Sequence, residues 1–135
     1  MQPWLAPYAL TVFAMAATAA LLLVQLLVLD VAGIKSRHVP GTPVQPDHAS
    51  FLFRAVRAHA NTNESIAAFI LLSVVAVFAS ASPAWTNACA WLYVTGRLGH
   101  MACYYSDLRT ARSIAFATSL LALFLLLFTV FAALF

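Results

Sequence analysis

The residues of this 135-residue chain that could do chemistry fall into two sets with helical spacing, both within long apolar segments. The first set is spaced three, four and three residues apart and comprises Arg54, Arg57, Asn61 and Glu64. The second set is spaced three and four apart and comprises Arg97, His100 and Tyr104. Such spacings place side chains on one face of an α-helix. The sequence therefore predicts two polar stripes that face each other inside a helical bundle.

Glu64 and Arg97 are predicted to meet at the same depth. Glu64 lies about 17 residues before the end of its apolar run and Arg97 about 14 after the start of the next, which is roughly 25 and 21 Å at 1.5 Å per residue. A carboxylate that faces lipid costs at least about 2.5 kcal/mol near mid-membrane, so we expect an ion pair between these two. The pair could bind a ligand or only hold the helices together, and the sequence leaves both readings open.

The remaining cations favour the ligand interpretation. They give a surplus of positive charge at one end of the predicted bundle, which suits an anionic ligand or anionic lipid head groups, and they are Arg54, Arg57, Arg109 and Arg112. No basic cluster with interleaved aromatic residues lies outside the apolar segments, which argues against nucleic acid as a partner. The histidines have no carboxylate or cysteine at ligand spacing, so no metal site is predicted. His38 and His48 are expected to be solvated loop residues.

Composition sets the elements that must position these residues. With 64% hydrophobic and 8% charged residues, the chain lies outside the range of soluble proteins. Four apolar runs are each long enough to cross about 30 Å of hydrocarbon. We therefore predict an all-α membrane protein, a single four-transmembrane-helix domain over residues 1–135. Its helices are expected at about 5–29, 48–81, 83–105 and 112–135.

Charge distribution predicts the orientation. Every Lys and Arg lies in 35–57 or 97–112, and the connection 80–87 has none. The positive-inside rule makes the loop 30–47 cytoplasmic and leaves both termini outside. Prolines 40, 43 and 46 make this loop irregular. Thr11, Thr18 and Gln25 recur every seven residues and mark a face that packs on protein.

The motifs resemble a known superfamily. Arg57-Ala58-His59-Ala60-Asn61-Thr62-Asn63-Glu64 fits the pattern R-A-x-x-N-x-x-E of the second helix of MAPEG proteins, the membrane-associated proteins in eicosanoid and glutathione metabolism. Gly96-Arg97-Leu98-Gly99-His100, then Tyr104, then Arg112-Ser113 resemble the third helix of that superfamily and the start of the fourth. The resemblance covers about Arg54 to the C-terminus.

That resemblance implies a homotrimer that binds glutathione between subunits near the cytoplasmic face. The residues it assigns to contact with the tripeptide are Arg57, Asn61, Glu64, Arg97 and Tyr104, with His100, Arg54 and Arg109 in the same two stripes or beside them. Arg112 would stabilise the thiolate, with Ser113 as a second candidate and Arg109 as the alternative arginine. Ala60 departs from the prostaglandin synthases, which have arginine there. His59 stands where the leukotriene synthase branch has glutamine, so His59 is expected to take over this contact with glutathione.

The leading functional hypothesis is a glutathione-dependent transferase or peroxidase, with glutathione as cosubstrate and a lipophilic electrophile or lipid hydroperoxide as acceptor. The alternatives are a non-catalytic lipid- or glutathione-binding member of the same superfamily and a small multidrug exporter. Exporters of that kind carry their carboxylate in the first helix, which here has none before Asp30. Expected partners are further copies of the chain, membrane lipids and the lipophilic substrate. The expected location is a bacterial inner membrane, which the chain crosses several times, with the active site toward the cytoplasm.

Overall fold

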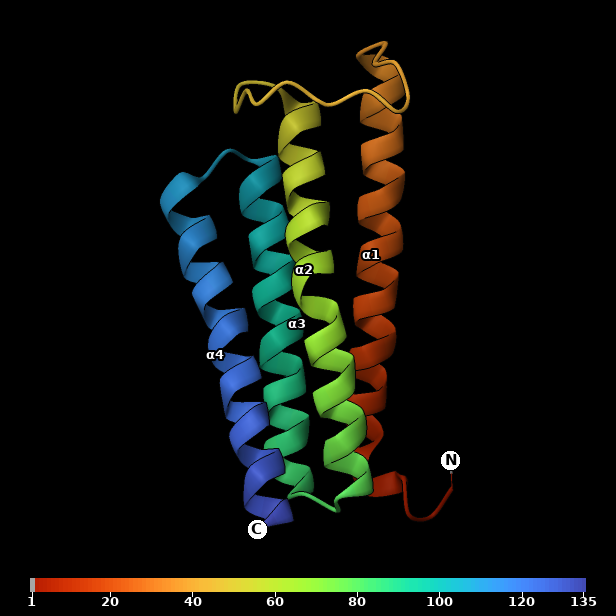
Figure 1. Cartoon of the computed structure of the whole chain (residues 1–135), viewed down its shortest axis with the longest axis vertical. Helices are drawn as coiled ribbons and strands as arrows, with labels where there is room; N and C mark the ends of the chain where they lie inside the picture. Colours follow the sequence, from red (N-terminus) through yellow and green to blue (C-terminus); the bar gives the residue numbers. More distant parts are fainter. Residues whose placement is uncertain (1) are drawn as a thin grey trace.

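The computed structural model describes residues 2–135 as a bundle of four long helices (Figure 1). A short 3-10 helix, η1 (Ala6–Tyr8), leads into α1 (Ala9–Lys35), and the remaining helices are α2 (Phe51–Phe78), α3 (Pro83–Tyr105) and α4 (Arg109–Leu134). The prediction of an all-α four-helix bundle is confirmed. The first helix continues past the predicted end at Leu29 to Lys35, so the loop before α2 is shorter than expected.

The helices run between two ends of different character. We call the end with the long connection, residues 36–50, and the short α3–α4 connection, residues 106–108, the loop end. Both termini and the α2–α3 turn lie at the opposite end, which we call the terminal end (Figure 1). α1 and α4 lie on opposite sides of the bundle, and α2 and α3 pack between them.

Three helices, α1, α2 and α4, are long and apolar enough to cross a membrane. α3 runs between the same two ends (Figure 1), although its sequence is more polar. Its position explains the difference, because α3 packs against each of the other three helices. Polar residues of α3 such as Thr86, Arg97 and His100 are therefore buried against protein and do not face lipid.

The core is built mostly from small side chains and one aromatic stack. Ala14, Ala76 and Ala90 are fully buried where the helices approach, and the rings of Phe69 and Tyr93 stack at a centroid distance of 4.2 Å. Small residues let helix backbones come close, which is the main source of packing energy in a membrane where lipid is as apolar as leucine. Both rings are fully buried between α2 and α3.

The seven-residue repeat in α1 faces protein, as predicted. Thr11, Thr18 and Gln25 are all buried. Thr11 donates from its hydroxyl to the Asn87 side-chain oxygen at 2.7 Å, and Gln25 donates to the Thr62 hydroxyl at 3.1 Å. These bonds fix α1 to α3 near the terminal end and to α2 near the middle of the bundle.

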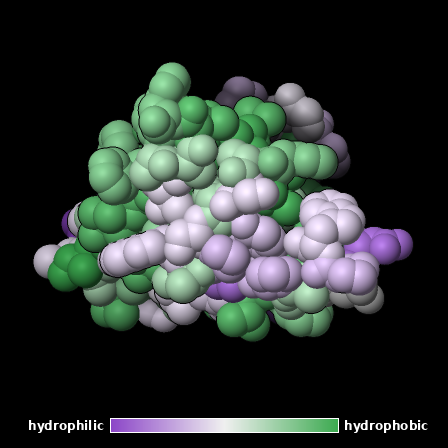
Figure 2. Space-filling view, turned by 90° about the horizontal axis from the view of Figure 1, so that it is seen from below, coloured by the Kyte–Doolittle hydropathy of each residue, from purple (hydrophilic) through white to green (hydrophobic). Residues whose placement is uncertain are grey.

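The terminal end carries little charge. Viewed from this end, the surface is largely apolar or weakly polar, with only small areas of strongly hydrophilic character (Figure 2). The turn between α2 and α3 is held by the Tyr8 hydroxyl, which donates to the carbonyl of Ala81. The side chains that could take part in chemistry therefore lie toward the loop end.

α3 and α4 approach closely at Gly96. A Cβ atom at this position would overlap the Ser119 hydroxyl and lie 2.9 Å from the Ser119 amide nitrogen and 3.1 Å from the Ala115 carbonyl oxygen. Two of these three atoms belong to the α4 backbone and cannot rotate away. Only glycine allows this approach, which sets the distance between the two helices that carry His100 and Arg112.

We predict that Gly96→Ala pushes α4 away from α3 and lowers the free energy of unfolding by about 1–3 kcal/mol, the usual range for overpacking. The measurement is thermal unfolding of the purified protein in detergent. Gly99→Ala is the matched control, because its Cβ would meet Ala115 Cβ at an ordinary 3.5 Å. Equal unfolding temperatures of the two variants would contradict the close approach.

Candidate functional site

A polar cavity of about 260 Å³ opens between α2, α3 and α4 in the half of the bundle nearer the loop end. Its lining combines residues from all three helices, and these are Asn61, His100, Tyr104, Arg112, Ser113 and Phe116. Five of the six are residues that the sequence predicted for the site. The three segments that carry the motifs are thus brought together by the fold.

Helical periodicity places the lining residues. His100 and Tyr104 are one turn apart on α3, both buried, and their rings meet edge to face at 4.9 Å. Arg112 and Ser113 lie in the first two turns of α4, which begins at Arg109. The short connection 106–108 reverses the chain, so the end of α3 and the start of α4 present these side chains to the same space.

Arg112 is oriented by two ring side chains, those of Tyr104 and His48. Its guanidinium carbon lies 4.8 Å from the centroid of the Tyr104 ring, and its Nη1 lies 3.3 Å from His48 Nδ1. Within residues 2–135 the one ion pair joins Arg109 to Asp107, 3.9 Å apart, so Arg112 has no carboxylate partner. The full positive charge of Arg112 is available to an anion in the cavity.

The start of α4 adds to this positive potential. A helix N-terminus carries about half a positive charge, because its first N–H groups have no partner within the helix. The first turn of α4 holds no acidic residue, and no side chain caps it. Two arginines at this end are unfavourable by themselves, and an anion bound beside Arg112 and Ser113 would relieve that repulsion.

The predicted ion pair between Glu64 and Arg97 is wrong. Arg97 Nη1 donates to the Asn61 side-chain oxygen at 2.6 Å and to the Asn61 carbonyl oxygen at 3.2 Å. The Asn61 amide nitrogen in turn donates to Glu64 Oε2 at 3.4 Å. Asn61 therefore stands between the two charges. An amide can do this because it has an oxygen for the cation and an N–H group for the carboxylate.

Arg97 lies behind the cavity and does not line it. Its side chain is 1% exposed, and its guanidinium carbon lies 5.4 Å from the Tyr93 ring centroid and 5.6 Å from that of Phe116. Aromatic faces stabilise a cation that has lost its water. Arg97 therefore holds Asn61 in the cavity wall, and its contact with a ligand stays a prediction.

Glu64 is exposed on the surface of a helix that crosses the membrane. Asn63, its neighbour, is exposed as well and contacts the His59 ring at 2.9 Å. Carboxylates and amides within a span face protein or a water-filled cavity, because exposure to lipid is costly. This part of the α2 surface is therefore polar, although α2 is long and apolar enough to cross a membrane.

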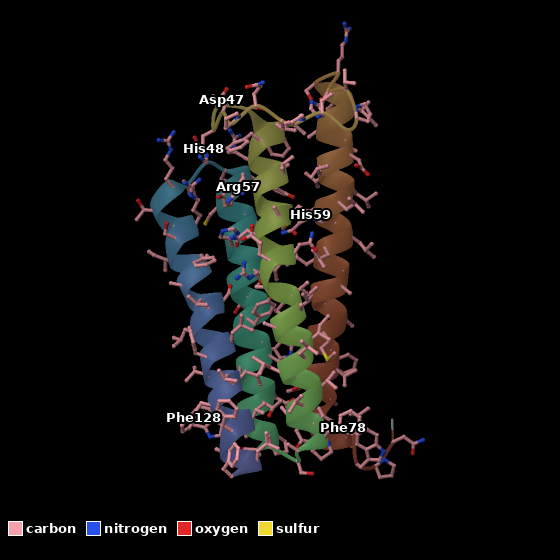
Figure 3. The ribbon with its side chains drawn as sticks, in the orientation of Figure 1. Asp47, His48, Arg57, His59, Phe78 and Phe128 are labelled. Atoms are coloured by element: carbon pink, nitrogen blue, oxygen red, sulfur yellow. The ribbon has the colours of Figure 1, made fainter. Side chains whose placement is uncertain are left out.

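Besides Arg97 and Glu64, four other predicted binding residues do not line the cavity. Arg54 donates to the carbonyl oxygens of His48 at 2.6 Å and Ala49 at 3.0 Å, so it fastens the loop. Arg109 pairs with Asp107 outside the cavity, and its side chain is 70% exposed. The two others, His59 and Arg57, are half-buried and exposed respectively (Figure 3).

Two residues of the site were not predicted for it. His48, expected to be a solvated loop residue, contacts Arg112 as described above. Phe116 supplies an apolar wall of the cavity and shields Arg97. Phe116 lies four residues after Arg112, so helical spacing from that arginine could have indicated it. The sequence around His48 does not indicate where its side chain lies, because the proline-rich loop that carries it has no regular structure.

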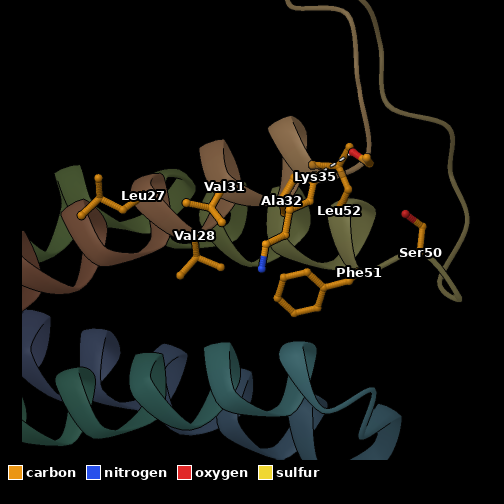
Figure 4. Close-up of a pocket in the computed structure, with 9 residues that line it drawn as sticks. Leu27, Val28, Val31, Ala32, Lys35, Ser50, Phe51 and Leu52 are labelled. Carbon is orange, nitrogen blue, oxygen red and sulfur yellow. Dashed lines mark hydrogen bonds between the residues drawn. The ribbon is translucent and has the colours of Figure 1, made fainter.

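A larger cavity of about 640 Å³ lies between the last turns of α1 and the first turn of α2 (Figure 4). Its walls are mainly aliphatic, including Leu27, Val28 and Val31, and Lys35 reaches across it toward the Phe51 ring (Figure 4). Its serines, Ser36 and Ser50, are occupied with helix-end hydrogen bonds. This cavity offers no grouping of acids, bases or nucleophiles, so it is not the candidate reaction site.

The sequence profile of the MAPEG family matches residues 11–132, nearly the whole chain. The chain belongs to the MAPEG family. No individual curated protein matches it closely enough to narrow the assignment within the family. MAPEG proteins are helical membrane bundles associated with eicosanoid and glutathione metabolism, and the family contains transferases, peroxidases and non-catalytic members. This protein is accordingly an integral membrane protein of that class.

Family membership gives the cavity a context. MAPEG members typically use glutathione and form trimers. In this member, the polar cavity joins the motif residues of α2, α3 and α4. The cavity is therefore the place to look for the MAPEG chemistry of this chain.

We predict that Asn61→Ala destabilises the protein even without ligand, because Arg97 loses its closest hydrogen-bond acceptor while remaining buried. Hydrogen bonds to charged groups contribute about 1.5–3 kcal/mol, so a loss of that order is expected in thermal unfolding in detergent. Asn63→Ala is the control, since its amide contacts His59 on the exposed surface. That variant should stay within about 0.5 kcal/mol of the parent. Equal effects would mean that Arg97 does not depend on Asn61.

Proposed function

We propose that this MAPEG protein is a glutathione-dependent transferase or peroxidase that acts on lipophilic electrophiles or lipid hydroperoxides. The single observation that carries the proposal is the cavity in which Arg112, without a carboxylate partner, faces Ser113, Tyr104 and Asn61. An arginine with its charge uncompensated, at a helix N-terminus, is suited to hold a thiolate. The thiolate, and not the thiol, is the reactive nucleophile.

Two reactions are open to a thiolate held in this way. In the transfer reaction, its sulfur forms a bond to an electrophilic carbon, and the leaving group departs with the bonding electrons. In the peroxidase reaction, its sulfur attacks the terminal oxygen of a hydroperoxide and the O–O bond breaks, which leaves a sulfenic acid on glutathione. The lipid departs as an alkoxide and becomes an alcohol by taking up the proton that the thiol released when it ionised. A second glutathione then condenses with the resulting sulfenic acid to give the disulfide and water. In both reactions Arg112 stabilises the thiolate, and Ser113 is the second candidate for contact with the sulfur.

The size of the cavity supports a site shared between subunits. Sites for small molecules usually enclose about 300–1,000 Å³, and the cavity of one subunit, about 260 Å³, falls below that range. A tripeptide that placed its thiol beside Arg112 would extend beyond the cavity. The remainder would lie against a neighbouring subunit.

The exposed polar surface of α2 supports the same arrangement. On this surface Glu64 can accept hydrogen bonds from an amine, and Arg57 can donate to a carboxylate; amine and carboxylate are the other charged groups of glutathione. Covering this surface with a second subunit and a charged ligand would remove the cost of exposing it to lipid. We therefore propose a homotrimer with the tripeptide between subunits, in which His59, directed away from the cavity of its own subunit, is able to reach the ligand of the next.

The acceptor would arrive from the bilayer. Phe116 is an apolar wall of the cavity, and α4 continues from it with exposed apolar residues such as Leu120 and Phe124. A lipophilic molecule can approach along this surface without leaving the membrane. By the distribution of Lys and Arg, the loop end with the cavity would face the cytoplasm and both termini the outside. A bacterial inner membrane is the proposed location.

We predict that Arg112→Ala lowers turnover of a generic aryl halide or a lipid hydroperoxide by about 10²-fold, the usual cost of removing a group that stabilises a developing anion. Arg109→Ala is the matched control. It removes an arginine from the same turn of α4, but one that is exposed and paired with Asp107, so activity should change by less than about twofold. Turnover should be measured with purified protein in detergent, with glutathione saturating.

Glutathione binding without turnover of any electrophile or hydroperoxide by the parent protein would reduce the assignment to a binding protein. A loss of activity in Arg109→Ala with none in Arg112→Ala would transfer the thiolate role to Arg109. Either result would overturn the mechanism proposed for Arg112.

We predict three subunits per particle when the protein is analysed by native mass spectrometry in mild detergent. The uncovered polar surface of α2 is the physical reason, since a monomer would leave Glu64 and Asn63 against lipid or detergent. The variant Glu64→Leu tests whether the number of subunits depends on this polar surface. Leu71→Ala, at an exposed position two turns along the same helix, serves as the control. A monomeric parent protein would contradict the shared site.

A further inference from the structure

The contact between the long loop and Arg112 concerns the mechanism directly and rests on the proposed function of Arg112. Residues 36–50 cross the loop end from α1 to α2, and the last part of the loop carries His48 to the side of α2 on which α4 lies (Figure 3). His48 Nδ1 lies 3.3 Å from Arg112 Nη1. A residue 64 positions earlier in the chain is thus in contact with the arginine of the cavity.

The hydrogen-bond roles in this contact are fixed by chemistry. A guanidinium has N–H groups and no acceptor, so Arg112 is the donor. His48 Nδ1 must then be the acceptor, which requires a neutral ring with its proton on Nε2. A neutral acceptor orients the guanidinium and leaves its charge uncompensated. A carboxylate in the same place would orient it equally well but would compete with a thiolate for the charge.

His48 is itself held in place by the first turn of α2. Its ring meets the Phe53 ring edge to face at 5.1 Å, with an angle of 89° between their planes. Its carbonyl oxygen accepts a hydrogen bond of 2.6 Å from Arg54 Nη1. The preceding residue, Asp47, accepts from the Ala49 amide at 2.8 Å. The loop is therefore fastened on both sides of His48, as a group that positions another side chain has to be.

Arg112 needs such a partner. Arginine side chains have many rotamers, and the other observed restraint on this guanidinium is the face of the Tyr104 ring at 4.8 Å. An aromatic face fixes the height of a cation above the ring but not its direction in that plane. The His48 contact supplies the missing direction.

We propose that His48 is a positioning residue that holds the Arg112 guanidinium at the cavity while leaving its charge free for the thiolate of bound glutathione. His48 does not touch the reacting sulfur. Its removal should impair ionisation of the thiol and the rate of the chemical step, and it should affect the binding of the rest of the tripeptide much less. This pattern distinguishes positioning of Arg112 from a general role in folding the loop.

The experiment compares His48→Ala, His48→Asn and His38→Ala with the parent protein in detergent. The asparagine side chain can place its oxygen where His48 Nδ1 lies and can accept from Arg112. His38 is the matched control, a histidine of the same loop that bonds instead to the Thr42 carbonyl oxygen at 3.1 Å. Three quantities are measured: the ultraviolet absorbance of the glutathione thiolate on binding, kcat with an aryl halide, and KM for glutathione.

His48→Ala should lower the thiolate signal and reduce kcat by roughly tenfold, because misplacing a catalytic group by about 1 Å is enough for such losses. The KM for glutathione should change by less than about twofold. Because this limit is well below the change in kcat, an effect on thiol ionisation can be distinguished from an effect on glutathione binding. His48→Asn should restore most of the thiolate signal and of kcat, and His38→Ala should equal the parent.

If the parent forms the thiolate and turns over while His48→Ala matches His38→Ala, the positioning role is overturned and the proposed function stands. A rise in KM with unchanged kcat, or no rescue by His48→Asn, also overturns it, because the residue would then act in binding or in loop folding. If the parent neither binds glutathione as thiolate nor turns over, the proposed function fails and the role of His48 fails with it.

Discussion

The polar half of this bundle depends on one constraint: the buried positive charge of Arg97 must be stabilised by neighbouring side chains. A guanidinium that is 1% exposed, within helices that cross a membrane, has no water to satisfy it and must find its partners inside the protein. Asn61 supplies two oxygens, and the rings of Tyr93 and Phe116 supply two aromatic neighbours. Asn61 of α2 and Phe116 of α4 are thereby both held against Arg97 of α3.

That compensation also shapes the surface and the cavity. Because Asn61 stands between Arg97 and Glu64, the carboxylate is not consumed by an internal ion pair and remains exposed on α2. The same Asn61 lines the cavity beside His100 and Arg112. Arg97 therefore stabilises the wall of the candidate site from behind, while Glu64 and Arg112, on either side of it, have no charged partner within residues 2–135.

The two arginines at the start of α4 have different environments because they contact different partners. Arg109 pairs with Asp107 and is exposed, whereas Arg112 meets the Tyr104 ring and a histidine and faces the cavity. Residues three apart lie close together on one face of a helix, so the partners of each side chain, and not the helical spacing, direct Arg109 toward solvent and Arg112 toward the cavity. Membership of the MAPEG family and this difference in environment together make Arg112 the centre of the proposed chemistry.

The sequence by itself determined the class of the protein, the four helices and the two polar stripes, because hydrophobic length and helical periodicity are local properties. It also indicated five of the six residues in the cavity lining. Only the tertiary structure decided that Arg97 bonds to Asn61 and not to Glu64, since equal depth in the bundle does not fix rotation about a helix axis or the choice of rotamer. Only the tertiary structure decided, too, that His48 reaches Arg112, because the path of an irregular loop follows from contacts with residues far along the chain, here Phe53, Arg54 and Arg112 itself.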